Sequence, residues 1–80
     1  MQQTLGILRL PQVKALTGLS RSSIYAAVKA GSFPKPFRLG PRAVGFSAGA
    51  VEAWVGARMA GRPETEVRAL VQNLNLKEAM

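Results

Sequence analysis

Hydrophobic residues near the start of the chain recur every three or four positions, which is the spacing of one face of a helix. They fall at Leu10, Val13 and Leu16. Pro11 suits the first turn of that helix because its φ is fixed and it has no N–H to leave unpaired. The pattern predicts a short helix over about 11–17, while Ile7 and Leu8 before it fit either a short strand or simple packing against the domain.

A second helix is predicted over residues 21–30 by the residues that would begin and end it. Gly18 interrupts the first pattern, and the Ser20 hydroxyl can accept a hydrogen bond from the free N–H groups of the next helix. Gly31 can close that helix in the left-handed conformation. Its apolar side carries Ile24, Ala27 and Val28. The opposite side is mostly polar and is left for a partner.

The segment 32–46 changes character, because three prolines and two glycines forbid a regular helix. Residues 37–39 alternate between apolar and polar, and residues 44–46 resume after a turn at 40–42. We expect a small β-hairpin here. The aromatic residues in and around it have apolar settings that favour the core over stacking on unpaired bases. They are Phe33, Phe37, Phe46 and Trp54.

Two further amphipathic helices are predicted in the last part of the chain. Ser47 can cap the first of them, which is expected to end before Pro63. Its apolar stripe consists of Val51, Trp54, Val55 and either Arg58 or Met59. The second stripe consists of Val67, Leu70, Val71 and Leu74. Two glutamates in the first turn of this last helix are favoured by the helix dipole, and its stripe needs an apolar partner.

Charge is distributed unevenly along the 80 residues. Residues 1–62 carry nine basic residues and one acid, Glu52, for a net charge of +8, whereas residues 63–80 carry −1. A compact +8 body attracts polyanions, of which nucleic acid is the commonest, with an acidic membrane surface as the rival. Since the apolar stretches are too short for a membrane span, and the N-terminus lacks a basic segment followed by an apolar signal core, we expect a cytoplasmic protein.

The residue inventory disfavours enzyme chemistry. Without cysteine or histidine there is no thiol nucleophile, imidazole base or ordinary zinc site. Glu52 has no second carboxylate in the body with which to form an acid and base pair. We therefore expect no catalysis, no metal, no cofactor and no small-molecule ligand.

Two short helices joined by a glycine-containing turn, the second opening on Ser-Arg-Ser-Ser, have the layout of a helix-turn-helix. In that motif the second helix enters the major groove of DNA by its N-terminal end. The predicted fold is mainly α with a small β-hairpin, a winged helix-turn-helix over residues 8–62, followed by a C-terminal helix or tail over 63–80.

Residues 8–62 resemble the AlpA family of phage and prophage regulators, which is similar to winged helix-turn-helix domains of the excisionase and MerR type. The matching elements, in order, are the Leu-Ser-Arg-Ser of 19–22 followed by Ile-Tyr, the Phe-Pro-Lys-Pro of 33–36, the Leu-Gly of 39–40 with Arg42, and the Val-Glu-Ala-Trp of 51–54. The chain departs from the family pattern at Phe46, where tryptophan is frequent, and at 48–50, where acids are more usual.

Candidate DNA-binding residues lie on the second helix and the hairpin. They are Ser20, Arg21, Ser22, Ser23, Tyr25, Lys29, Arg38 and Arg42. Arg21 is placed to read a guanine edge, and Arg42 to meet the minor groove or the backbone. Ser22 and Ser23 suit phosphate binding or capping, and Tyr25 can add its ring to the core while its hydroxyl meets a phosphate.

The resemblance implies a positive transcription regulator at the bacterial nucleoid, with double-stranded DNA as its partner. Two alternatives to this function stay open. One is an excisionase-like protein that bends DNA for a recombinase, and the other is an adaptor that binds RNA polymerase as an activator or antiterminator. The stripe Val67, Leu70, Val71 and Leu74 could pack on the protein's own core, on a second copy bound to DNA, or on RNA polymerase. On the last alternative, deletion after Pro63 would leave DNA binding but abolish regulation.

Overall fold

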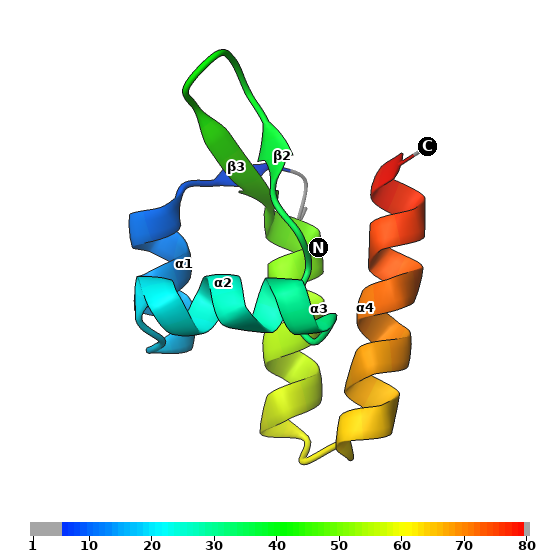
Figure 1. Cartoon of the computed structure of the whole chain (residues 1–80). Helices are drawn as coiled ribbons and strands as arrows, with labels where there is room; N and C mark the ends of the chain where they lie inside the picture. Colours follow the sequence, from blue (N-terminus) through cyan, green and yellow to red (C-terminus); the bar gives the residue numbers. More distant parts are fainter. Residues whose placement is uncertain (1–5, 80) are drawn as a thin grey trace.

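Within residues 6–79, the chain forms four helices and a three-stranded antiparallel sheet (Figure 1). The computed structural model describes the backbone of these residues and the side chains of residues 6–76. In chain order the elements are β1 (Ile7–Leu8), α1 (Leu10–Thr17), α2 (Arg21–Ala30), β2 (Phe37–Arg38), β3 (Val44–Ser47), α3 (Ala48–Met59) and α4 (Glu64–Ala79). The prediction of a mainly α, winged helix-turn-helix fold with a C-terminal helix is confirmed. Over residues 6–79, no helix is long and apolar enough to cross a membrane.

Local hydrogen bonds set the helix boundaries. The Ser20 hydroxyl accepts from the Ser23 N–H at 3.1 Å and so begins α2, which ends at Gly31 with a φ of 80°. The Ser47 hydroxyl likewise accepts from the Ala50 N–H at 3.2 Å and begins α3. These are the capping residues that the sequence indicates.

The first helix begins differently. Leu10 is its first residue, one earlier than predicted, and the Arg9 side chain makes no capping bond. Instead the Gln12 side chain accepts from the Arg9 N–H at 2.8 Å. One half of a capping box therefore stands in for the missing polar N-cap.

The strand β3 lies at the centre of the sheet, in the order β1-β3-β2. Ile7 pairs with Ser47, so of the two structures that fitted the N-terminal segment the strand is the one formed. On the other side β3 pairs with β2 to make the expected hairpin, which projects beyond the helices in Figure 1. A Cβ at Gly45 would collide with Ile7 Cγ2 of β1 and lie 3.1 Å from Cδ1 of Leu39, the residue that follows β2.

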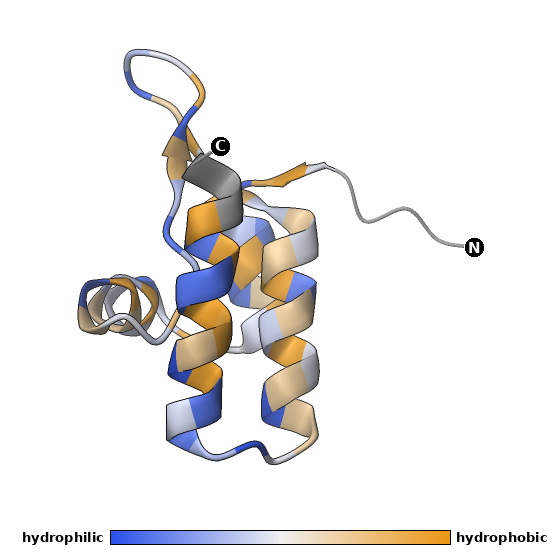
Figure 2. Ribbon diagram, turned by 90° about the vertical axis from the view of Figure 1, so that its right-hand side faces the viewer, coloured by the Kyte–Doolittle hydropathy of each residue, from blue (hydrophilic) through white to orange (hydrophobic). Residues whose placement is uncertain are grey.

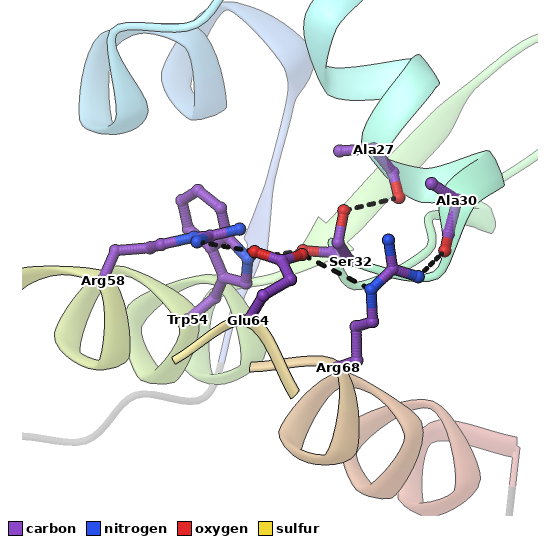
Figure 3. Close-up of polar contacts among 7 residues, drawn as sticks. All are labelled: Ala27, Ala30, Ser32, Trp54, Arg58, Glu64 and Arg68. Atoms are coloured by element: carbon purple, nitrogen blue, oxygen red, sulfur yellow. Dashed lines mark hydrogen bonds and ion pairs between the residues drawn. The ribbon is translucent and has the colours of Figure 1, made fainter. Parts of the chain in front are cut away.

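A single hydrophobic core joins all four helices to β3. It consists of Val13, Ile24, Phe33, Phe46, Val51, Trp54, Val67 and Val71. Phe33 packs edge-on against Phe46 and Trp54, with ring centroids 6.0 and 4.7 Å away. The Trp54 Nε1 donates to the Ser32 carbonyl at 2.7 Å, so its one polar atom is satisfied (Figure 3). The core assignment is confirmed for these three aromatic residues, while Phe37 is half-buried.

The helix α4 lies alongside α3, joined to it by a short turn (Figure 2). Val67 and Val71 from its stripe are fully buried in the shared core, and Leu70 and Leu74 are half-buried. The Arg68 guanidinium also donates to the Ala30 carbonyl at the C-terminal end of α2 (Figure 3). Of the three partners considered for the stripe, the protein's own core is the one that takes its two valines.

Candidate nucleic-acid interface

The second helix of the helix-turn-helix is anchored by one face and exposed on the other. Gly18, with a φ of 73°, turns the chain at the end of α1, and α2 begins three residues later. Ile24 is fully buried under α1, while Arg21 and Ser22 are exposed at the free end of α2. The N-terminal turn of α2 is therefore presented to solvent on a fixed support, as a reader of the major groove requires.

A hollow of about 380 Å³ opens where the start of α1, the first turns of α2 and the hairpin meet. It is lined by Arg9, Leu10, Pro11, Arg21, Tyr25, Arg42 and Val44. We call it the arginine hollow, because three separate parts of the chain each contribute one arginine to it. Among residues 6–76 these three arginines make no ion pair with a carboxylate. Their charge is available to an anionic partner.

Tyr25 connects this hollow to the core. Its ring lies 6.4 Å from that of Phe46, and the Arg21 guanidinium carbon lies 5.3 Å from the Tyr25 ring centroid. A cation over an aromatic face is attracted to it, so Tyr25 helps to hold the Arg21 side chain in place. The expectation that the Tyr25 ring adds to the core is met, and its role toward DNA stays a prediction.

The hairpin brings one of its two arginines to the hollow. The Leu39 N–H donates to the Ala43 carbonyl at 2.8 Å and closes the turn that carries Arg42. Arg38, exposed on β2, donates instead to the Pro41 carbonyl at 3.4 Å and does not line the hollow. Of the two, Arg42 is thus the one grouped with the residues of α2.

The remaining candidates on α2 are spread around the helix. In the N-terminal cap of α2, the Ser20 hydroxyl donates a hydrogen bond to the Ser23 hydroxyl at 3.0 Å. Ser23 lines a second, more apolar hollow on another side of α2. Lys29 is exposed in the last turn of α2, about 12 Å along the axis from Arg21. The structure therefore groups Arg21 and Tyr25 with Arg42 and leaves Ser23 and Lys29 apart from them.

Among residues 6–76, the arginines at the junction of α3 and α4 form ion pairs with glutamates, unlike those of the arginine hollow. Glu64 binds Arg58 at 3.1 Å and Arg68 at 3.5 Å (Figure 3), and Glu66 binds Arg62 at 3.1 Å. Two acids of the C-terminal segment thus neutralise part of the positive charge counted in residues 1–62. The net charge of +8 overstates what this end offers to a polyanion.

Arg9 is the one arginine of the hollow that is not among the candidates predicted from the sequence. It is exposed and lies between β1 and α1. Nothing in its local pattern separates it from an ordinary solvated arginine. Only the pairing of β1 with β3, which brings the chain past the base of the hairpin, places it beside Arg42.

Comparison with known proteins gives one family. The family model described as prophage CP4-57 regulatory protein (AlpA) matches residues 6–59. The uncharacterized protein ORF88 of Enterobacteria phage P4 is 46% identical over 55 residues, which cover 69% of this chain and 62% of that protein. The chain thus matches less than two thirds of the length of that relative. No solved structure matches the chain.

Proposed function

The chain belongs to the AlpA family of prophage regulatory proteins, and we propose that it regulates transcription by binding a specific site on double-stranded DNA. In this proposal α2 enters the major groove and the hairpin reaches toward the next minor groove. The observation that carries it is the meeting of Arg21 and Arg42, from two separate elements, at one hollow without carboxylate partners among residues 6–76.

The proposed contacts are of two kinds: those that read the base sequence and those that position the protein on the DNA backbone. Arg21 reads a base edge, with guanine as its best bidentate partner. Arg42 and the Tyr25 hydroxyl bind the backbone and fix the register of the protein on DNA. Ser22, Lys29 and Arg38, all exposed, add contacts to phosphates further out. Ser20 and Ser23 act mainly through the cap that holds the start of α2.

A footprint of the purified protein on the DNA upstream of its own gene tests the proposal and counts the copies bound. Affinity for that site and for a scrambled duplex is then measured over a series of salt concentrations. We expect discrimination between the two, and a log–log salt slope of about −0.9 for each of roughly four to six phosphates per protomer. Equal affinity for both duplexes, or an affinity independent of salt, would reject the proposal.

The finer proposal is positive regulation through contact with RNA polymerase, as an activator or antiterminator. Support comes from exposed apolar side chains: Met59 is 82% and Leu16 is 52% exposed, and both border a hollow of about 560 Å³. These residues and the half-buried Leu70 and Leu74 are better placed for a protein contact than the two buried valines of α4. Met59→Ser should then leave the footprint intact and lower transcription in a reconstituted assay.

Footprinting and transcription assays also distinguish the proposed regulator from the excisionase-like alternative. A DNA-bending protein would occupy several adjacent sites and change the mobility of circularly permuted fragments. It would have no effect that depends on a promoter. A single footprint with promoter-dependent transcription favours the regulator, and adjacent footprints with bending favour the alternative.

A further inference from the structure

We propose that the arginine hollow holds one phosphodiester of the DNA strand that separates the major groove from the minor groove, and that Arg9 is one of the residues that bind it. This inference rests on the proposed function and adds a binding site and a residue to it. Arg9 lies outside the second helix and outside the hairpin, where the candidate DNA contacts of the sequence are found.

The first argument is geometric. A protein that places one element in the major groove and another at the adjacent minor groove must straddle the sugar-phosphate strand between the two grooves. The arginine hollow lies between the elements concerned, since Arg21 and Tyr25 of α2 form one wall and Arg42 and Val44 of the hairpin form another. A DNA strand passing between the two elements therefore runs over this hollow.

The second argument is chemical. Guanidinium groups present forked N–H donors that match the oxygens of a phosphate. Arg9 and Arg42 bring two such groups to the hollow for the phosphate, while the guanidinium of Arg21, the proposed base reader, adds a third positive charge to its lining. Three like charges around one hollow repel one another, and among residues 6–76 no carboxylate is paired with them. An anion in the hollow relieves that repulsion, and a phosphodiester of the bound duplex is the anion at that place.

The third argument concerns how Arg9 is held. It directly follows β1, whose Leu8 pairs with Phe46 of β3, so its backbone is attached to the base of the hairpin. Its N–H donates to Gln12 Oε1 at 2.8 Å, which fixes the entry into α1. Neither interaction uses the Arg9 side chain. The guanidinium is thus carried on a fixed backbone position, and its removal leaves the fold in place.

Arg9→Ala tests the site against a matched control, Arg62→Ala. Both remove one exposed arginine and one positive charge, but Arg62 lies in the turn between α3 and α4 and is paired with Glu66. We expect Arg9→Ala to weaken binding to the footprinted and scrambled duplexes by the same factor, about fivefold to tenfold at low salt. Its salt slope should shrink by about 0.9. Arg62→Ala should change either affinity by less than about twofold.

Two measurements keep the test independent of any single variant. Arg9→Lys keeps the charge without the fork, so it should restore the salt slope but only part of the affinity. Ethylation interference on the unmodified protein should show one phosphate, between the two groove contacts, whose ethylation blocks binding, and Arg9→Ala should be less sensitive to that ethylation.

If Arg9→Ala behaves like Arg62→Ala while Arg21→Ala abolishes discrimination, the phosphate site is wrong and the proposed function stands. Absence of any interfering phosphate between the grooves overturns the site in the same way. If the unmodified protein binds the footprinted and scrambled duplexes equally well, the proposed function itself fails.

Discussion

Two groups of three arginines lie in different parts of the molecule and are in opposite electrostatic states. Around the arginine hollow, Arg9, Arg21 and Arg42 come from three separate parts of the chain, and among residues 6–76 none of them pairs with a carboxylate. At the junction of α3 and α4, the second group is bound to two glutamates. This group consists of Arg58, Arg62 and Arg68.

The difference teaches that a count of charges does not locate an interface. Within the second group, the Arg58–Glu64 pair joins the end of α3 to the start of α4, and Arg58 also lies over the Trp54 ring at 5.2 Å. Its charges are already compensated within the chain. The first group keeps its charges for an outside anion. Loss of an arginine from the first group should therefore lower DNA affinity, whereas a change in the second group should alter it little.

The largest effect is expected on removing α4. Deletion after Pro63 takes Val67 and Val71 out of the core, where each buried valine contributes about 1.5–3 kcal/mol. A domain of this size is stable by only about 4–12 kcal/mol, so we expect loss of the cooperative unfolding transition and of DNA binding together. Circular dichroism with thermal melting measures the first, and fluorescence anisotropy with labelled DNA the second.

A matched pair of substitutions refines that prediction within the same helix. Val71→Asp places a charge in the core and should unfold the protein, whereas Leu76→Asp changes a side chain that is 60% exposed and should leave the melting temperature nearly unchanged. A truncated protein that melts like the full chain and still binds DNA would return α4 to the role of a tail for an outside partner.

The next largest effect, on DNA affinity and specificity, is expected at the N-terminal end of α2. Arg21→Ala should weaken binding to the footprinted site by about 1–3 kcal/mol and relax the preference at one base pair, because a bidentate base contact is lost. Its melting temperature should change by less than about 4 °C, since the side chain is exposed and surface substitutions change stability by about 0.5 kcal/mol or less. Binding to a panel of single-base variants of the site measures the preference. Retention of full discrimination would move the reader away from α2.

A smaller and more uniform effect is expected at the hairpin. Arg42→Ala should weaken binding to all duplexes by about 1 kcal/mol, and should reduce the salt slope by about one phosphate, because a backbone contact carries no base information. Arg38→Ala is the internal comparison, since that side chain bonds to its own turn and lies outside the hollow. If the Arg38 variant lost more affinity than the Arg42 variant, the hollow would not be the centre of the interface.

The smallest effect is expected from freeing the paired arginines. Glu64→Gln removes the carboxylate that binds Arg58 and Arg68, both partly exposed, and should change the unfolding free energy by less than about 1 kcal/mol. DNA affinity should rise only slightly, because the released charges lie away from the proposed interface. A large gain in sequence-specific affinity would show that this end also faces DNA.

Local sequence patterns predicted the helices well because the interactions that begin and end them span only a few residues. Ser20 and Gly31 set the bounds of α2 at the positions expected, and Ser47 did the same for α3. The periodic apolar positions likewise identified Ile24 and Trp54 as core residues. From the candidate site, Arg21, Tyr25 and Arg42 could be named from their positions on the predicted helix and turn.

Only the tertiary structure determined which residues that are distant in the sequence lie next to each other. The apolar stripe of α4 predicted an apolar partner without identifying it. In the structure the partner is the protein's own core, where Val67 and Val71 pack against residues far away in the chain. Arg9 joined the hollow only because β1 pairs with β3, about 40 residues later in the sequence. Likewise Arg58 meets Glu64 only because the chain reverses between α3 and α4. Capping and periodicity are encoded within a turn or two of helix, whereas long-range pairing depends on how the finished elements fit around one core.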